Sequence, residues 1–233
     1  MFKGFREKDF AIFLEPEQAA RVDYIRDHLH PRLRDLGTEL AGHLSRSVDV
    51  ALRCQIRSGH WHKNPWATWI SIISVEEKIR SDPKRPRLGV FLDHREALVG
   101  YLQSIWQPRW KELVEGFPPL AELTDDTARE GKLQIAIGHW IRPKEEGAEW
   151  ERETIRYRTA KAALKAASRL GQDFFLLGRT YPWPDRKDLL CSSAFTAEAR
   201  SVLEAAWPLY HLAFLQDYVR PTRRRMRLLA GRT

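Results

Sequence analysis

Three apolar segments with β-prone residues follow one another in the first half of the chain, and their spacing constrains the fold more than any other feature. They are residues 66–75, 87–92 and 97–106. Residues 93–96 separate the second segment from the third by a length that suits a hairpin loop. The pattern predicts an antiparallel meander, in which the polar residues 76–86 form a mobile loop between the first two strands.

Helical spacing precedes the meander. Apolar residues recur every three or four positions between Val22 and Leu44, which predicts helices that pack on a core. Pro31 predicts a kink or a junction between two helices, because proline lacks an N–H and disfavours helical geometry in the residue before it. Gly37 predicts a helix end.

The rest of the chain combines further helices and strands. Glutamates and arginines three residues apart, Glu149 with Arg152 and Glu153 with Arg156, predict a long helix that ends at Gly171. The expected elements are helices over residues 108–114, 120–129, 149–170 and 196–218, the last perturbed at Pro208, and strands over residues 132–141 and 174–179. Alternation in the first of these two strands indicates one buried face.

Together these elements predict an α+β fold, with a mainly antiparallel sheet flanked by helices in a single compact domain of residues 1–219. A basic tail of residues 220–233 follows. The formal net charge is +8, and the tail contributes six arginines and no acid, so the residues before it carry only +2. An arginine-rich end of this kind binds phosphates readily, but it is equally familiar as a solvated extension.

Composition also bears on the cellular compartment. The longest apolar run, residues 67–75, is interrupted by hydroxyl residues and is far shorter than the roughly 20 residues that span a bilayer. The N-terminus lacks the apolar region of a secretory signal, and Cys54 and Cys191 stand far apart in no redox or metal spacing. These features predict a cytoplasmic protein without a membrane partner.

The N-terminal residues carry a resemblance to a known family. Their pattern comprises Phe2, Gly4-Phe5, Asp9-Phe10, Phe13, Arg21, Ile25-Arg26, Pro31, Leu33 and Leu36-Gly37. It resembles the opening of the YktB-like family of uncharacterised bacterial proteins, and segments similar to that family's strands follow in the same order. The resemblance implies a compact single-domain α+β fold and brings no established activity or catalytic residue. The arginine tail and the His60-Trp61-His62 cluster depart from it.

A fainter similarity is to the N-terminal DNA-recognition domains of McrB-type restriction proteins. Those domains join a proline-tryptophan strand, here Pro65-Trp66, to a glycine-bearing strand and an apolar third strand, here residues 89–91 and 98–102. They bind modified DNA, so this similarity implies a nucleic-acid ligand.

An aromatic and basic constellation is the main candidate site. Tryptophans beside cations can stack an unpaired base, at about 1–3 kcal/mol for each base, while basic side chains contact phosphates. The expected ligand-binding residues are Trp61, His62, Lys63, Trp66, Trp69, Lys84, Arg85, Arg87, Arg223, Arg224 and Arg225, and Arg53 and Arg57 would add phosphate contacts. On a strand Trp66 and Trp69 face opposite sides, so at most one of them is open. The leading hypothesis is a non-enzymatic protein that binds DNA or RNA.

A small metal-assisted hydrolase or nuclease-like enzyme is the first alternative. His60 and His62 would share a strand face, but no pattern supplies the further ligands that zinc needs, although His94 and His139 could be recruited. Asp93 and the segment Glu130-Gly131-Lys132 loosely match the acids and lysine of metal-dependent nucleases, and a charged connection between a helix and a strand also explains that segment. No metal, cofactor or catalytic residue is predicted.

An interaction adaptor is the second alternative. Apolar residues recur at alternating steps of four and three near the C-terminus, and they would form a partner face if the helix resumed after Pro221. They are Leu215, Val219, Thr222, Met226 and Leu229, of which only Thr222 is polar. A solvated tail explains the same residues, and nothing in the sequence supports a homo-oligomer.

Overall fold

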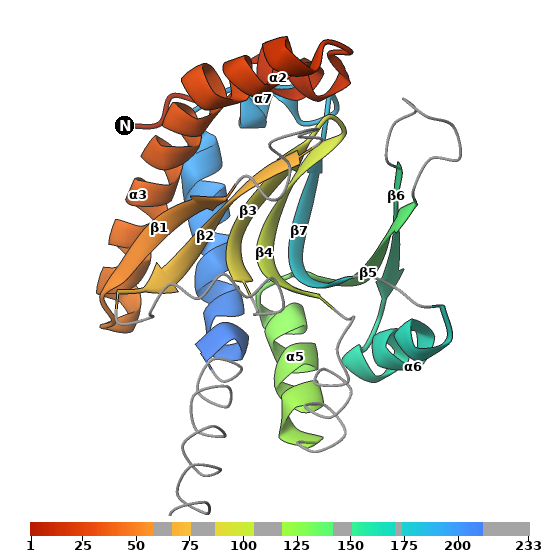
Figure 1. The fold of residues 1–233 in the computed structure, drawn as a ribbon. Coiled ribbons are helices and arrows are strands. Elements are labelled where there is room, and N and C mark those ends of the chain that lie inside the picture. The colour runs from red at the N-terminus through yellow and green to blue at the C-terminus, as the bar shows by residue number, and fades with distance from the viewer. Residues whose placement is uncertain (58–66, 76–86, 105–117, 142–150, 171–173, 212–233) are drawn as a thin grey trace, which may run out of the picture.

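The structure, a computed structural model, describes residues 1–57, 67–75, 87–104, 118–141, 151–170 and 174–211. These residues contain a seven-stranded antiparallel sheet with the order β1-β2-β3-β4-β7-β5-β6 (Figure 1). The strands are β1 (Leu52–Arg57), β2 (Ala67–Ser74), β3 (Arg87–Asp93), β4 (Glu96–Ser104), β5 (Gln134–Ile141), β6 (Glu151–Tyr157) and β7 (Phe174–Pro182). The predicted α+β class and the single compact domain are confirmed, and the expected boundary at residue 219 lies outside the described residues.

Helices flank this sheet. They are α1 (Glu7–Ala11), α2 (Gln18–Tyr24), α3 (His30–Val48), α5 (Pro118–Glu130), α6 (Ala160–Leu170) and the short α7 (Lys187–Leu190). A 3₁₀ turn, Ile12–Leu14, follows α1, and a π-helical turn, Ile25–Leu29, joins α2 to α3. Residues 194–211 form a further helix, which stays helical through Pro208.

The predicted meander is confirmed by strands β2, β3 and β4. The Asp93 carboxylate lies at the hairpin between β3 and β4 and accepts hydrogen bonds from the backbone N–H groups of Arg95 at 2.8 Å and Glu96 at 3.0 Å. A short acidic side chain that satisfies turn amides in this way fixes the hairpin. The expected mobile loop of residues 76–86 and the expected helix of residues 108–114 lie outside the described residues.

The N-terminal helices differ from the prediction at one residue. Pro31 lies in the first turn of α3, directly after the π-helical turn, so two helical segments do meet there. Gly37 does not end the helix, because α3 continues to Val48 and its C-cap Asp49 adopts the left-handed conformation with φ 52°. A Cβ atom on Gly37 would lie 2.8 Å from the Cβ of Cys54, so this glycine lets α3 approach β1 closely.

Two strands were not predicted. Residues 149–170 were expected to form one helix, but Glu151–Tyr157 is strand β6 and the helix α6 begins only at Ala160. Ile155 pairs with Ile137 across the sheet, which favours the strand over the helical ion pairs that the charges suggested. Strand β1 was missed although Leu52, Cys54 and Ile56 alternate with polar residues along it.

Of the remaining predictions for the second half, those of α5, β5 and β7 are confirmed. The last helix is confirmed as far as residue 211 without an interruption at Pro208, and its expected continuation to residue 218 lies outside the described residues. The start of α6 has two caps: the Asp125 carboxylate accepts a hydrogen bond from the Ala160 N–H at 2.6 Å, and the Thr159 hydroxyl accepts one from the Ala162 N–H at 3.2 Å. These caps satisfy donors that the first turn of a helix leaves open, which explains why the helix begins at Ala160 and not earlier.

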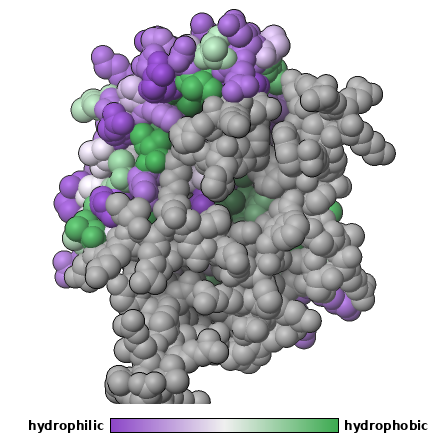
Figure 2. Space-filling view, in the orientation of Figure 1, coloured by the Kyte–Doolittle hydropathy of each residue, from purple (hydrophilic) through white to green (hydrophobic). Residues whose placement is uncertain are grey.

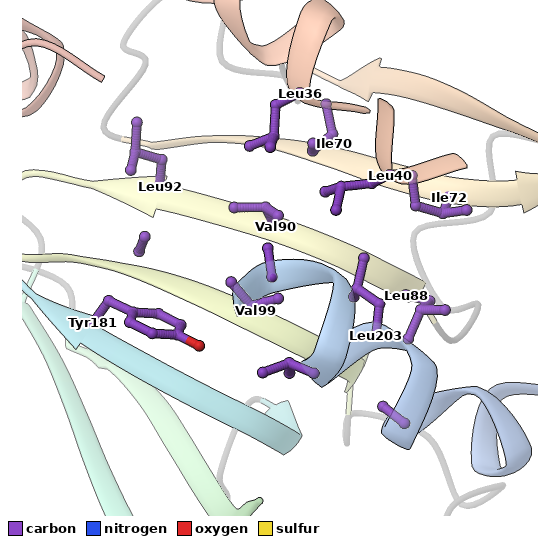
Figure 3. Packing of buried hydrophobic residues seen from close by; sticks show 14 of the residues in the cluster. Leu36, Leu40, Ile70, Ile72, Leu88, Val90, Leu92, Val99, Tyr181 and Leu203 are labelled. Atoms are coloured by element: carbon purple, nitrogen blue, oxygen red, sulfur yellow. The ribbon is translucent and has the colours of Figure 1, made fainter. Parts of the chain in front are cut away.

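The main core lies between one face of the sheet and two helices. Figure 3 shows Leu36 and Leu40 of α3 close to Ile70 and Ile72 of β2, with Leu203 of the last helix close to Leu88 of β3. We call this side of the sheet the first face. The outer side of the N-terminal helices is mostly hydrophilic (Figure 2), as expected for helices whose apolar residues face a sheet.

Candidate nucleic-acid interface

The opposite side of the sheet, which we call the second face, carries a smaller apolar cluster. It contains Ala67, Trp69, Phe91, Leu98, Ala136, Phe174 and Leu176, with Leu102 packed against it. Because successive side chains of a strand point to opposite faces, Trp69, Ser71 and Ile73 of β2 all belong to this face. Arg87, Gly89 and Phe91 of β3 belong to it by the same alternation.

Two of the predicted ligand-binding residues, Trp69 and Arg87, lie in the described part of the chain, and the structure brings them together. The guanidinium carbon of Arg87 is 4.8 Å from the centre of the Trp69 ring, within the range of a cation–π contact. The Phe91 ring lies nearly parallel to the indole, with ring centres 6.2 Å apart. Trp69 is only 9% exposed, so the indole is a buried support for Arg87 and not an open stacking platform.

The other predicted ligand-binding residues lie outside the described residues. They are Trp61, His62, Lys63, Trp66, Lys84, Arg85, Arg223, Arg224 and Arg225. The predicted partner face from Leu215 to Leu229 lies outside them too. We expected the side chain of at most one of Trp66 and Trp69 to be exposed. The structure shows that Trp69 is buried, and Trp66 lies outside the described residues.

Strand β1 adds two arginine positions to the second face. Arg57 pairs in register with Trp69, and Arg53 pairs with Ile73 on the same strand. The half-buried Arg53 side chain lies on the second face with Trp69 by alternation along the paired strands. The sequence signal that could have revealed this was the alternation of arginine and glutamine with apolar residues in Leu52–Arg57. The sheet thus places arginine positions 53, 57 and 87 on one face, with position 57 opposite Trp69 and position 53 opposite Ile73.

A row of small residues crosses the second face beside this group. Ser71 of β2 pairs with Gly89 of β3, which pairs with Gly100 of β4, which pairs with Gly178 of β7. A Cβ atom on any of the three glycines would lie 1.9–2.3 Å from a backbone oxygen of a neighbouring strand. The chain therefore requires glycine at all three positions, because the backbone of the neighbouring strand occupies the space that a side chain would need.

The metal and nuclease alternatives gain nothing from the described residues. Within these ranges no group of three or more His, Cys, Asp or Glu side chains could hold a metal ion. Asp93 is 2% exposed and its carboxylate binds the hairpin amides. Glu130 ends α5, and Gly131 and Lys132 form the turn into β5, as the charged connection predicted. The side chains of His60, His62 and His139 lie outside the described part.

A polar cluster around one buried carboxylate, that of Asp9, lies near the N-terminus, and no sequence pattern had indicated it as a site. The Asp9 carboxylate is fully buried and accepts hydrogen bonds from the Arg6 N–H at 2.7 Å, the Tyr24 hydroxyl at 3.0 Å and the Arg32 guanidinium. Burial raises the pKa of Asp9 and outweighs the opposite effects of the Arg6 amide and Arg32. With its donors all supplied by helices of the scaffold, this cluster fixes the N-terminal helices to one another.

A second polar cluster joins β7 to its neighbours on the first face. The Arg179 guanidinium donates to the backbone oxygens of Gly131 at 3.0 Å and Lys132 at 3.3 Å, just past the end of α5. It also pairs with the Glu198 carboxylate, which accepts a hydrogen bond from the Tyr181 hydroxyl at 3.2 Å. Burial, and then the charge of Glu198, raise the pKa of Tyr181. These partners are structural, since each ties one element to the next.

No helix among the described residues is long and apolar enough to cross a membrane. No family model matches the chain. It is nevertheless similar over nearly its whole length to UPF0637 proteins of Listeria. One from Listeria monocytogenes serotype 4b is 25% identical over 212 residues, covering 90% of this chain and 97% of the relative.

UPF0637 proteins of two other species extend this similarity. One from Listeria welshimeri is 24% identical over 223 residues, and one from Listeria innocua is 24% identical over 215 residues. Each alignment covers 91% of this chain and 98% of the relative. The similarity to McrB-type domains gains no support from these relatives. The chain is therefore similar over about nine-tenths of its length to bacterial UPF0637 proteins, whose names state no activity.

Proposed function

We propose that this protein is a non-enzymatic nucleic-acid-binding protein that uses the second face at strands β1 to β3. The observation that carries the proposal is the placement of arginine positions 53, 57 and 87 on one face of strands β1 to β3, with Arg87 in contact with Trp69. Arginines concentrated on one surface attract the phosphate backbone and release its counterions. The arginine-rich tail of residues 220–233 would add a second, less specific source of the same attraction.

Trp69 supports this role through Arg87. The N–H donors of a guanidinium lie in its own plane, so contact of its flat side with an aromatic ring does not use them. Arginine pairs with phosphate oxygens through these in-plane donors. Stacking also reduces the side-chain freedom that binding would otherwise have to remove. Since the indole is buried, phosphate contacts and not stacking on Trp69 would supply most of the affinity.

Salt-dependent binding tests the proposal. Fluorescence anisotropy would follow labelled single-stranded and duplex oligonucleotides between about 50 and about 200 mM salt. We expect the affinity of the wild-type protein to fall steeply with salt. An Arg53→Ala, Arg87→Ala double variant should bind more weakly, with the slope of log affinity against log salt reduced by about one for each phosphate that the variant no longer neutralises.

The matched control removes two arginines elsewhere. Arg26 and Arg129 are exposed on helices, at 61% and 76%, and each pairs only with aspartates of its own helical region in the described structure. An Arg26→Ala, Arg129→Ala double variant has the same net charge as the test variant and should retain wild-type affinity. No binding at low salt, or an equal reduction of affinity in both double variants, would contradict the proposal.

A second proposal concerns the family to which the chain belongs. We infer that the chain belongs with the YktB-like proteins, and the order of its N-terminal motif and its three meander strands supports this assignment. The similarity to UPF0637 proteins over nine-tenths of the chain is consistent with it. No observation among the described residues favours the metal-assisted enzyme or the adaptor.

A further inference from the structure

Strand β1 ends the sheet on one side and has an outer edge to which a further strand could pair. Among the residues that the structure describes, β1 pairs with β2 alone, and Figure 1 shows β1 at one end of the sheet, beside α3. The Val75 N–H donates to the Ala51 oxygen at 2.9 Å, in the same register that pairs Leu52 with Ser74. Only every second residue of an antiparallel strand bonds to a given neighbour, so the residues of β1 in phase with Ala51 are those that bond to β2.

The alternate residues of β1 direct their backbone N–H and C=O groups away from β2. These residues are Leu52, Cys54 and Ile56. The Leu52 N–H agrees with this direction, because it donates to the Ser45 hydroxyl of α3 at 2.9 Å and not to a strand. A strand edge that presents N–H and C=O groups outward is a ready template for pairing with another strand.

The side chains of the same three residues are only partly covered. Leu52, Cys54 and Ile56 pack against the main core on the first face, yet each of them is half-buried. Their neighbours on β2 differ: Ile72, opposite Cys54, is fully buried, and Ile70, opposite Ile56, is 1% exposed. A further strand beside β1 would therefore cover apolar surface as well as bond to the outward backbone groups.

We propose that β1 pairs antiparallel with β1 of a second copy of this chain, about a two-fold axis at Cys54. This register sets Cys54 opposite Cys54 of the partner subunit and Leu52 opposite the partner's Ile56. All three outward-pointing residues of each copy are then paired, and their apolar side chains meet on the first face. The two sheets become continuous, as in a dimer whose two copies use the same surface. This inference goes beyond the proposed function and does not depend on nucleic-acid binding.

Charge favours this register over its two neighbours. On the second face it sets Arg53 opposite the partner's Gln55, so no arginine of β1 faces an arginine. An axis at Arg53 would set Arg53 opposite Arg53 of the partner subunit, and an axis at Gln55 would set it opposite the partner's Arg57. Like charges directly opposite each other destabilise a sheet. Either shift would also leave one of the three outward-pointing residues unpaired.

Helix α3 has small residues where it contacts β1 near the proposed axis. A Cβ atom on Gly37 would lie 2.8 Å from the Cys54 Cβ, and the exposed Thr38 has its hydroxyl 3.8 Å from the Cys54 Sγ. Ser45 contacts β1 at Leu52. Pairing of the two β1 strands brings the two copies of α3 together above them. Small side chains on this flank of α3 favour the close approach of the helices.

Oxidative cross-linking tests the position of the axis, because the sequence contains two cysteines, Cys54 and Cys191. Hydrogen-bonded residues that face each other have Cα atoms about 5.5 Å apart, within the roughly 4.4–6.8 Å that disulfides span. Diamide would take up two electrons and two protons from the two thiols. We expect the Cys191→Ser variant, which keeps Cys54, to form a disulfide-linked dimer on a non-reducing gel. The Cys54→Ser variant, which keeps Cys191, should form none.

Two substitutions of Gln55 test the register through charge. Gln55→Glu sets opposite charges at the pair with the partner's Arg53, and Gln55→Arg sets like charges there. Analytical ultracentrifugation without nucleic acid would measure the dimer dissociation constant of each variant. We expect Gln55→Glu to lower this constant and Gln55→Arg to raise it, each by about two- to thirtyfold, because the two-fold axis repeats the pair. With the axis at Gln55 itself, both variants would instead raise it.

A wild-type protein that stays monomeric at every concentration and forms no Cys54 disulfide would overturn the dimer. A dimer that both Gln55 variants weaken alike, or one that responds to neither Gln55 nor Cys54, would overturn the β1 interface in this register. Thermal melts would show that each variant folds, and the cross-link decides the question if a Gln55 variant does not fold. Nucleic-acid binding by a monomer would leave the proposed function intact.

Discussion

The guanidinium carbon of Arg87 lies 4.8 Å from the centre of the Trp69 ring, although the two residues stand in different rows of the sheet. Trp69 pairs in register with Phe91, and Arg87 begins strand β3 four residues earlier. Each side chain therefore reaches over the position between them, where Ser71 faces Gly89. This contact joins the positive charge of the second face to its buried aromatic cluster.

The contact between Arg87 and Trp69 should contribute to the free energy of unfolding. We expect a double-mutant cycle of Arg87→Ala and Trp69→Leu to give a coupling of about 0.5–1 kcal/mol in the free energy of unfolding, as cation–π pairs do. Urea denaturation of the four proteins would measure it. Fully additive effects would mean that the observed contact does not stabilise the fold, and Arg87→Lys should retain only part of the coupling because it lacks the planar guanidinium.

Two glycines of helix α3 should respond in opposite ways to the same substitution. A Cβ on Gly37 would lie 2.8 Å from the Cys54 Cβ, whereas a Cβ on Gly42 would meet only the Arg46 Nη1 atom, at 3.9 Å. Gly42→Ala should stabilise the protein by about 0.5–1 kcal/mol through helix propensity. Gly37→Ala should destabilise it by about 1–3 kcal/mol, since overpacking against β1 outweighs that gain.

Thermal or urea unfolding of both alanine variants measures this difference. The two substitutions change the same helix by the same methyl group, so each serves as the control for the other. A Gly37→Ala variant more stable than wild type would show that α3 and β1 can separate at no cost, contrary to the close approach described above.

The stability of the protein should depend on pH through His30. Its ring nitrogen Nε2 lies 3.2 Å from the Thr68 hydroxyl, between α3 and the first face of β2. Burial, and then the charge of Arg34, lower the pKa of His30 below its ordinary value of 6.5. The unfolded chain therefore binds this proton more readily, so stability from His30 is present above about pH 6.5 and falls as the pH drops through that value.

Replacing the imidazole should remove this part of the pH dependence. His30→Gln keeps a neutral side chain that can bond to Thr68, so the difference in unfolding free energy between pH 7.5 and pH 5.5, both about one unit from the ordinary value, should shrink. His28→Gln, which removes an exposed imidazole two residues earlier, should leave the wild-type difference in place. An unchanged difference in His30→Gln would refute the assignment to His30.

The sequence by itself determined the helices and strands whose local hydrophobic pattern agrees with their tertiary packing. The meander of β2, β3 and β4 follows from three β-prone segments and a hairpin-length spacer, and α3 follows from leucines spaced by three and four residues. Arg87 and Trp69 could be selected as site residues because charge and aromatic content are visible in sequence. Their contact could not be, because it depends on the register of β2 against β3.

Only the tertiary structure decided the elements whose local signals conflict. Charges in residues 149–156 favour a helix, but Ile155 and Tyr157 gain more from pairing with Ile137 and Ile135 of β5, so the segment is strand β6. Gly37 reads as a helix end in sequence, and packing against Cys54 makes it the contact point of α3 with β1. The same holds for Ser71, which strand register sets beside Gly89 and in one row with Gly100 and Gly178 of two further strands. Propensity acts within a few residues, whereas register and burial join residues that lie far apart in the chain, and these decided where the candidate site is.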